Sequence, residues 1–211
     1  MSRLEIAVLD VTGQQHAASP HLLFRLRVTE TTGAVVHAVA LRCQLRLEPQ
    51  RRPYDPTEQA GLTDLFGTAE RYPTTLKPFL WTHATALVQG FQGSTELDLP
   101  VACTYDFDVA GTKYLQALRG GEVPLVLLFS GTVFTRGETG FAVEQVGWDV
   151  EASCRMPVAT WHDLMDSYFP GGGWIRLDRA TLDALARFRS ARGLTSWEQT
   201  LDALLPLAAE L

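Results

Sequence analysis

Histidine, serine and acidic side chains are the residues of this sequence that could transfer protons, attack a substrate or bind a metal. The five histidines are His16, His21, His37, His83 and His162. None has a second ligand at the H-x-x-x-H or H-E-x-x-H spacing of a metal site. If the protein were an enzyme, its catalytic side chains would come from distant parts of the sequence and meet only in the folded chain. The three candidates for such a site are His37, His83 and Asp106. That hypothesis requires hydrogen-bond reach between them.

Three other patterns do not support catalysis. Asp163 follows His162, but adjacent helical residues point about 100° apart and cannot form a relay. Ser130 lies in a strand-like run without the G-x-S-x-G pattern of a nucleophile elbow. Gly171–Gly173 lacks the lysine and the spacing of a phosphate-binding loop, and is typical of a helix stop. The sequence therefore predicts a protein that is not an enzyme, with no catalytic residue, cofactor or metal.

Composition limits the class of protein. The chain has 211 residues, 46% hydrophobic and 20% charged, as expected for one soluble globular domain. Its net charge of -6 argues against a nucleic-acid partner. No apolar run reaches the roughly 20 residues that span a bilayer. Three cysteines without a C-x-x-C pair, and no signal peptide, favour a cytoplasmic location.

The elements that would position any site are organised around the run Val123–Phe134. It is the longest apolar, β-prone stretch, and it lies between two polar, glycine-containing breaks. This pattern predicts a strand buried on both faces. We expect the preceding strands to pair around it and the helices that follow Met156 to cover it.

Alternating residues predict several strands before this run. Leu4–Val11 is expected at a sheet edge, where it could pair with its copy in a homo-oligomer. Residues 22–29 alternate, and residues 37–48 place His37 on the apolar face together with Val39. Such two-faced strands are typical of an antiparallel sheet with one solvated face.

Further strands are predicted at 79–89, 97–107 and 141–152. Gly90–Gly93 is expected to form the turn between the first two, and Asp108 to cap a short helix that ends near Gly120. Together these patterns predict a continuous antiparallel sheet.

Apolar residues repeat with helical period after residue 156. Thr160 with Asp163, Asp178, and Thr195 with Glu198 are the expected N-terminal caps of three helices. We predict an α+β fold in which an antiparallel β-sheet, SecB-like or sandwich-like, packs against C-terminal helices. Residues 1–156 would form the sheet region, with a long insertion at 49–78, and 157–211 the helical region of the same domain.

The insertion is the first place we would look for a partner, because long loops in compact domains are often functional. A short helix is expected over 57–66. Aromatic side chains dominate buried interface anchors. Six aromatic residues are predicted to contact a protein partner: Tyr72, Phe79, Trp81, Tyr168, Phe169 and Trp174. For each of them the alternative is a place in the core.

The C-terminal part resembles the SecB-type export chaperones. The similarity is carried by Met156–Met165, Tyr168–Gly171, Ile175–Leu177 and Thr181–Leu185, in which a proline opens a helix, a Phe-Pro turn follows and an Asp-Ala-Leu helix closes the chain. The triple glycine, Trp174 and the longer strand region depart from that family. The resemblance implies an antiparallel sheet backed by C-terminal helices, and peptide-chaperone activity.

The whole chain also resembles an uncharacterised family of high-GC bacteria. Val39–Cys43, Leu128–Phe134 and Trp161–Ile175 carry this similarity. Genes of that family often lie beside those of oxygen-tolerant uptake [NiFe]-hydrogenases. The resemblance implies an accessory role in the assembly or scaffolding of that enzyme, and no catalytic residue to transfer.

The leading hypothesis is therefore a non-enzymatic, chaperone-like accessory protein that binds another polypeptide, such as a hydrogenase subunit or precursor. The alternative is a small-molecule or lipid-binding protein. It would require a closed cavity between sheet and helices, lined by leucine and phenylalanine with a few polar groups.

Overall fold

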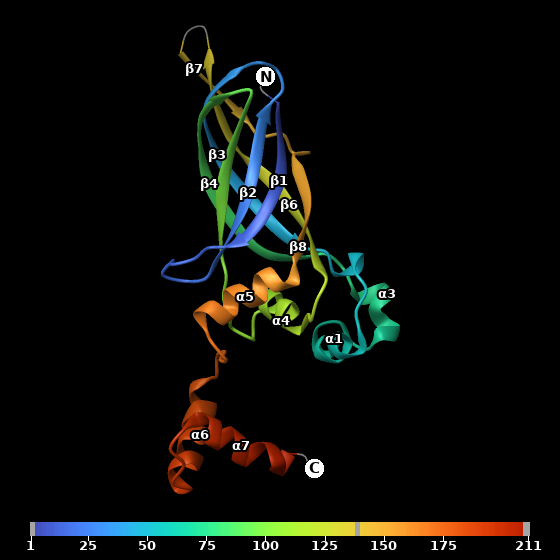
Figure 1. Ribbon diagram of the computed structural model, residues 1–211, viewed down its shortest axis with the longest axis vertical. Coiled ribbons are helices and arrows are strands. Elements are labelled where there is room, and N and C mark those ends of the chain that lie inside the picture. The colour runs from blue at the N-terminus through green and yellow to red at the C-terminus, as the bar shows by residue number, and fades with distance from the viewer. Residues whose placement is uncertain (1–2, 138–139, 209–211) are drawn as a thin grey trace. The chain divides into compact units, whose positions relative to one another are not determined.

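A computed structural model describes residues 3–137 and 140–208 (Figure 1). The strands are β1 (Leu4–Gly13), β2 (His21–Glu30), β3 (Val35–Leu47), β4 (Phe79–Gln92), β5 (Ser94–Ala102), β6 (Glu122–Gly137), β7 (Gly140–Gln145) and β8 (Glu151–Pro157). The helices are α1 (Pro56–Gly61), α2 (Thr63–Phe66), α3 (Tyr72–Thr75), α4 (Ala110–Ala117), α5 (Val158–Tyr168), α6 (Arg179–Ala191) and α7 (Trp197–Ala208). Two short 3-10 helices, η1 (Pro49–Arg51) and η2 (Ala69–Arg71), lie in the insertion.

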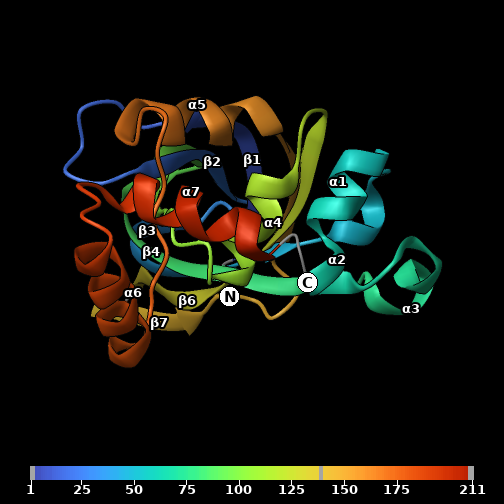
Figure 2. The same ribbon diagram turned by 90° about the horizontal axis from the view of Figure 1, so that it is seen from below.

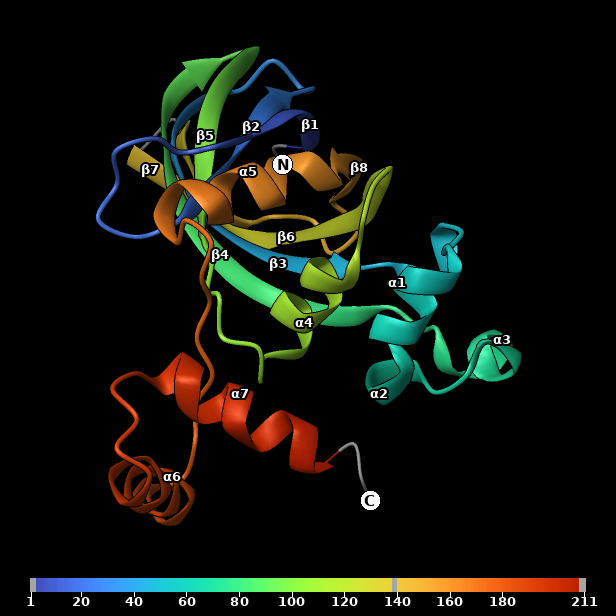
Figure 3. The same cartoon turned by 60° about the horizontal axis from the view of Figure 1, so that its bottom comes forward.

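The strands form two antiparallel sheets, so the predicted α+β class is confirmed. One sheet has the order β1-β2-β5, and the other has the order β4-β3-β6-β7 with β8 also paired to β6. Figure 3 shows the smaller sheet facing the larger one. Phe24 on β2 and Cys43 and Leu45 on β3 are fully buried, which places the core between the sheets. The alternation predicted for β2 and β3 creates this core.

β6 is the central strand of the larger sheet. It pairs with β3 along one edge and with β7 and β8 in succession along the other. Its inward face is buried, as Val123 and Leu127 show, but Leu128 on the other face is only partly buried and Ser130 is exposed. The prediction that both faces are buried was therefore wrong, because no layer of the described first unit covers the outer face.

The single strand predicted over 141–152 is two strands. β7 and β8 pair with different parts of β6, and the intervening residues 146–150 leave the sheet as a loop. Backbone hydrogen bonds from Val146 N to Gly131 O (2.9 Å) and from Phe129 N to Val150 O (3.0 Å) mark where the loop departs and returns.

A register shift moves His37 to the exposed face of β3. The pairing of β3 with β6 shifts between Val36 and Ala38, so Val36 is buried while His37 is exposed. A bulge of this kind inverts the side-chain alternation locally. The predicted placement of His37 beside Val39 on the apolar face was wrong for this reason.

The turn between β4 and β5 is shorter than predicted, and it joins strands of two different sheets. Gly93, at φ 74°, is the one residue between the two strands, and Gly90 lies inside β4. A left-handed backbone of this kind favours glycine. β5 ends at Ala102, so Tyr105 and Phe107 lie in the connection to α4 and not in a strand.

Figure 2 shows α5 lying across one end of the sheets, with α4 beside it. Trp161, Leu164 and Met165 of α5 are buried there, as the helical period predicts. α5 begins at Val158 after Pro157, and its N-cap makes no side-chain hydrogen bond, so the capping box predicted at Thr160 was wrong.

α4 also differs at its start. Its N-cap is Val109, not the predicted Asp108, and makes no side-chain hydrogen bond. None of the described helices has both the length and the apolar character needed to cross a lipid bilayer.

The insertion folds into η1, α1, α2, η2 and α3. Leu62 and Phe66 are buried, and the ring of Phe66 lies 6.1 Å from that of Tyr114 on α4. The predicted helix over 57–66 is present as two short helices, because Leu62 interrupts the helical backbone between Gly61 and Thr63.

The chain divides into two compact units, Met1–Trp174 and Ile175–Leu211. α5 therefore belongs to the unit that contains the sheets, whereas α6 and α7 form the second unit. In that unit Asp178 caps α6 as predicted, accepting a hydrogen bond from Thr181 N at 2.8 Å. The Ser196 hydroxyl, and not Thr195, accepts from the start of α7, at 3.2 Å from Gln199 N.

Candidate functional site

The outer face of the larger sheet carries a row of aligned residues that crosses four strands. Leu87 on β4 pairs with Ala40 on β3, Ala40 with Thr132 on β6, and Thr132 with Gln145 on β7. The side chain of Leu87 is 71% exposed. The small side chains of Ala40 and Thr132 lie between Leu87 and β7, and the surface here is an open, shallow hollow.

A second row lies one step along the same face. Gln89 pairs with Ala38, Ala38 with Phe134, and Phe134 with Val143 on β7. Phe134 is half-buried, and Val143 is 60% exposed. Leu87 and Val143 are therefore exposed branched apolar side chains on the same outer face, at its two outermost strands, β4 and β7.

β7 is the last strand in the order of the larger sheet. In the part of the chain that the structure describes, no strand pairs with its second edge. An edge of this kind presents a row of N–H and C=O groups that can pair with another chain. β7 has six residues, with Glu144 as its one charged side chain.

Trp148 lies on the loop between β7 and β8. The loop turns tightly, with a hydrogen bond from Val150 N to Gly147 O at 3.2 Å, and it is anchored by the buried Val146. Trp148 is 96% exposed, more than any other large hydrophobic residue described. We call the free edge of β7 together with Leu87, Val143 and Trp148 the β7 surface.

Five of the six aromatic residues predicted to contact a partner are half-buried and pack against the core. The Tyr72 ring lies 5.8 Å from that of Tyr54, and the Phe79 ring 5.9 Å from that of Tyr114. The Trp81 ring lies 6.3 Å from that of the buried Trp161.

Tyr168 and Phe169 hold the end of α5 in place. The Tyr168 hydroxyl accepts a hydrogen bond from Ala17 N at 3.0 Å, and the Phe169 ring stacks on Tyr105 at 5.5 Å. Trp174 differs from the other five, because it is 46% exposed. The six residues do not gather into one surface; the structure distributes them over the insertion, β4 and the end of α5.

The groups considered for an enzyme are not brought together. His83 pairs with Gln44, and His37 lies seven residues before Gln44 on β3. At about 3.3 Å per residue the two histidines are about 23 Å apart along the sheet, beyond hydrogen-bond reach. His162 Nε2 donates a structural hydrogen bond to Leu118 O at 2.8 Å. Among the described residues, no group of three histidine, cysteine or acidic side chains is placed to hold a metal ion.

The three cysteines are free thiols, and burial disfavours their thiolate form. Burial raises the pKa of Cys103 and of Cys154 to about 12. Burial, with a smaller contribution from Cys154, raises the pKa of Cys43 to about 12 as well. At neutral pH these groups are thiols, and thiols are poor nucleophiles and poor metal ligands.

Side chains fill the space between the sheets and α5. Trp161, Tyr114 and Phe24 are among the largest fully buried residues. A hollow between the end of β1 and α5 opens to solvent and is lined mostly by polar residues such as Thr12 and Asp163. These features do not favour the alternative hypothesis of a closed, apolar cavity.

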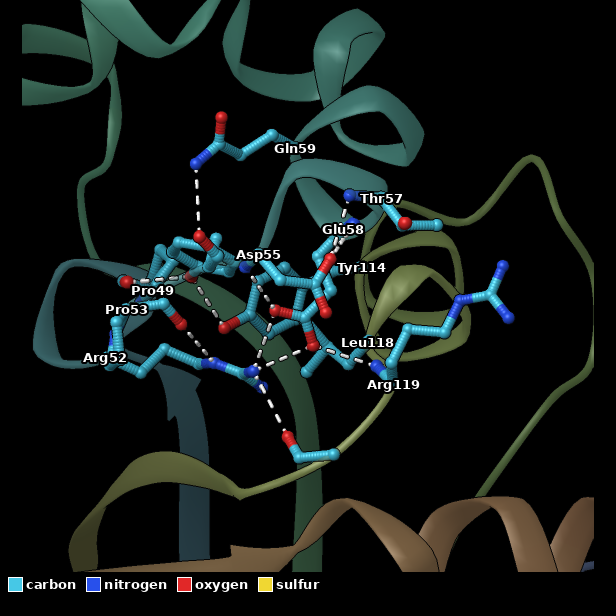
Figure 4. A network of polar contacts seen from close by, with 12 residues as sticks. Pro49, Arg52, Pro53, Asp55, Thr57, Glu58, Gln59, Tyr114, Leu118 and Arg119 are labelled. Carbon is cyan, nitrogen blue, oxygen red and sulfur yellow. Dashed lines mark hydrogen bonds and ion pairs between the residues drawn. The ribbon is translucent and has the colours of Figure 1, made fainter.

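A buried polar network fixes the insertion to the body (Figure 4). Arg52 donates to Glu58 at 2.8 and 3.0 Å, and its side chain and that of Glu58 are nearly buried, at 7% and 4% exposure. Glu58 also accepts from Arg119 N at 2.8 Å, and Arg52 donates to Gly120 O at 3.1 Å. Arg52 Nη1 is buried without a hydrogen-bond partner, but Arg52 Nη2 and both Glu58 carboxylate oxygens are bonded within the protein, so the network is a structural brace.

The tyrosines beneath this brace are part of the core. The Tyr54 hydroxyl donates to Pro49 O at 2.7 Å and lies 2.9 Å from the Tyr114 hydroxyl. Burial is the main cause that raises the pKa of both phenols, that of Tyr114 to about 12. The insertion is therefore a packed element, and the exposed anchors lie elsewhere.

Sequence reasoning missed the β7 surface. The segment Gly147-Trp148-Asp149 carries the one usable signal, a tryptophan between two turn-forming residues, which is typical of a loop tip. Leu87 and Val143 carry no such sequence signal. Both lie in alternating strand patterns, and such a pattern does not show whether another layer of the protein covers the outward face.

Comparison with known proteins places the whole chain in one family. The model of DUF6084, described as a family of unknown function, matches residues 1–210. No curated protein matches the chain. Among solved structures, a β-glucosidase from Kluyveromyces marxianus is similar at a TM-score of 0.28 and 6% identity, over 74% of this chain and 15% of that one. This chain thus spans a small part of that enzyme, and the similarity is too low to support any argument about fold or activity.

Proposed function

The chain belongs to DUF6084, a family of unknown function, and we propose from its own geometry that it is a non-enzymatic accessory protein that binds another polypeptide at the β7 surface. One observation carries the proposal: Trp148, at 96% exposure, lies on the loop that directly follows β7, whose second edge the described chain leaves unpaired.

The geometry suits an extended segment of the partner. An extended peptide can add a strand to a free sheet edge, where backbone hydrogen bonds provide affinity and alternate side chains provide specificity. Val143 projects from β7 itself, and Trp148 lies three residues after the end of β7 at Gln145. Tryptophan is among the residues most enriched at the centres of protein interfaces. The partner segment would therefore be apolar, extended and without proline at its pairing positions.

The first partners to test are subunits or precursors of [NiFe]-hydrogenases, as the sequence resemblance implies, and a cytoplasmic location is part of this proposal. A precursor that has not yet folded exposes apolar, extended segments. A protein that binds such segments before folding acts like a chaperone, so the proposal includes a chaperone-like role. The net charge of -6 opposes a nucleic acid as the partner.

The proposal is tested with tagged full-length chain in native cells, followed by direct binding of any partner identified. We expect wild-type chain to recover the same defined partner reproducibly, Trp148→Ala to lose it, and Trp174→Ala to retain it. Trp174 is a suitable control because it is the exposed member of the aromatic set predicted from the sequence.

Hydrogen–deuterium exchange then locates the contact. Partner binding should slow exchange of the β7 amides and leave those of the insertion unchanged. Recovery of the partner by Trp148→Ala at the wild-type level, or protection confined to the insertion, would refute the β7 surface as the binding site.

A further inference from the structure

The second unit is a two-helix hairpin with well-defined ends. α6 closes with hydrogen bonds from Gly193 N to Ser190 O (3.2 Å) and from Leu194 N to Arg189 O (3.0 Å), and Gly193 is left-handed at φ 63°. This is the Schellman arrangement, which ends a helix sharply. The chain therefore specifies both helices and the turn between them.

The hairpin buries no apolar core of its own. Among its described residues, Thr200 is the one buried side chain. Its large apolar residues with at least 38% exposure are Ile175, Leu177, Leu182, Trp197, Leu201 and Leu205. Leu205, at 66%, is the most exposed of them.

Three of these residues form a continuous ridge on α7. Trp197, Leu201 and Leu205 are spaced four residues apart, so they follow one i, i+4, i+8 row of the helix surface. Rows of this spacing are the ridges that fit between the side chains of a second helix when helices pack. Arg189 of α6 lies over the Trp197 ring, and Leu201 and Leu205 stay open, at 45% and 66% exposure.

The hairpin is also too small to be stable with its apolar face in water. Structures of fewer than about 40 residues need disulfides, a metal or association to fold, because they bury too little surface. The second unit, Ile175–Leu211, has 37 residues and contains no cysteine. Covering its exposed apolar ridge would therefore stabilise it.

The charges on the two helices identify the occupant. α6 and its C-cap carry four arginines, Arg179, Arg187, Arg189 and Arg192, against one acidic residue, Asp183. α7 carries Glu198 and Asp202 and no basic residue. A surface with one basic and one acidic helix is complementary to itself after a twofold rotation, because each helix then meets its opposite.

We propose that the occupant is the hairpin of a second copy of this chain. The α7 ridge of each copy packs against α6 of the other, and the two hairpins form an antiparallel four-helix bundle. Within each hairpin the Arg189 guanidinium lies 4.1 Å from the centroid of the Trp197 ring, so α6 of the same copy covers one face of that ring. The dimer involves only the second unit and does not depend on the β7 surface.

Light scattering during size-exclusion chromatography of the full-length chain measures this directly. We expect a mass twice the 23.3 kDa of one chain at micromolar concentration. Leu201→Glu should give the single-chain mass, because it places a charge in the ridge. The matched control is Leu80→Glu, which changes a leucine of the first unit with nearly the same exposure as Leu201 (46% against 45%) and should leave the dimer intact.

A charge swap separates loss of association from loss of folding. One variant, Arg187→Glu with Arg192→Glu, makes α6 acidic; a second, Glu198→Arg with Asp202→Arg, makes α7 basic. Each alone should be monomeric, and an equal mixture should form the heterodimer, since only that pair restores opposite charges at both contacts. A monomeric wild type, whether its ridge is covered by another protein or by its own first unit, would overturn the proposal. So would a mixture that stays monomeric.

Discussion

The Arg52 guanidinium lies 2.8 Å from the Glu58 carboxylate, and both side chains are almost wholly removed from water. The neighbouring Arg51 forms an equally short ion pair with Glu48, yet its side chain is 55% exposed. Two adjacent arginines thus make contacts of the same length in different environments. Their contributions to stability should differ because a buried charge that loses its partner cannot be solvated.

We expect Arg52→Gln to lower the free energy of unfolding by about 3–5 kcal/mol, the usual cost of breaking a buried ion pair. Arg51→Gln should change it less, by about 1 kcal/mol, because water reaches the Arg51 side chain although that of Glu48 is only 10% exposed. Urea denaturation of both variants measures the difference. Equal effects would mean that the network of Figure 4 does not brace the insertion.

Gly131 and Gly140 share an unusual backbone but differ in their surroundings. Both have φ near 142°, and a Cβ on Gly131 would lie 2.0 Å from the Ala40 carbonyl oxygen, whereas nothing lies within 4 Å of a Cβ on Gly140. Gly140→Ala should cost about 1 kcal/mol through backbone strain alone. Gly131→Ala should cost on the order of 3 kcal/mol or more, because β3 must move aside. Thermal denaturation compares the two, and similar melting temperatures would contradict the close approach of β3 to β6.

The Glu30 carboxyl group makes the free energy of unfolding depend on pH. Burial alone would raise the pKa of Glu30, but hydrogen bonds from the Thr32 hydroxyl and from the N–H groups of Thr32, Arg3 and Ala34 together lower it. A carboxyl group with a lowered folded-state pKa stabilises the protein above its unfolded pKa of 4.5, and this contribution is lost as the pH falls through the lower folded value.

Glu30→Gln should therefore be less stable than wild type at pH 7, and the difference should shrink as the pH is lowered below about 4.5. Denaturant midpoints measured from pH 7 down to about pH 3 give this comparison. A difference that stays constant over that range would show that the Glu30 carboxylate is not the group responsible.

Trp148 and Trp161 are opposites in burial, at 96% and 0% exposure. Trp161→Ala should cost about 3–5 kcal/mol, because it leaves a large cavity beneath α5. Trp148→Ala should change stability by less than about 0.5 kcal/mol, as surface substitutions do. Calorimetry of the two variants tests this, and a destabilised Trp148→Ala would show that the residue is structural and not a free anchor.

The raised pKa values of Cys43, Cys103 and Cys154, each about 12, predict slow alkylation. Only thiolates react with iodoacetamide, and burial disfavours that form. At pH 8 we expect little modification of folded chain and rapid modification of all three residues in denaturant, followed by mass spectrometry. Rapid labelling of one cysteine in the folded protein would identify an accessible, activated thiol.

The alternating residues of β2, the apolar run of β6 and the helical period of α5 could be interpreted from sequence alone. Each depends on geometry inside one segment, because side chains alternate along a strand and repeat every 3.6 residues in a helix. The Asp178 cap was equally local. The α+β class followed from the order of these segments.

Tertiary structure decided the features that depend on pairing between distant segments. The bulge that exposes His37 and the division of residues 141–152 into β7 and β8 both arise from register along β6. A one-residue shift of register exchanges the two faces of a strand, and no local pattern encodes it. For the same reason Trp148 and Leu87 could not be distinguished from core residues by type, since exposure depends on what the rest of the chain places against a face.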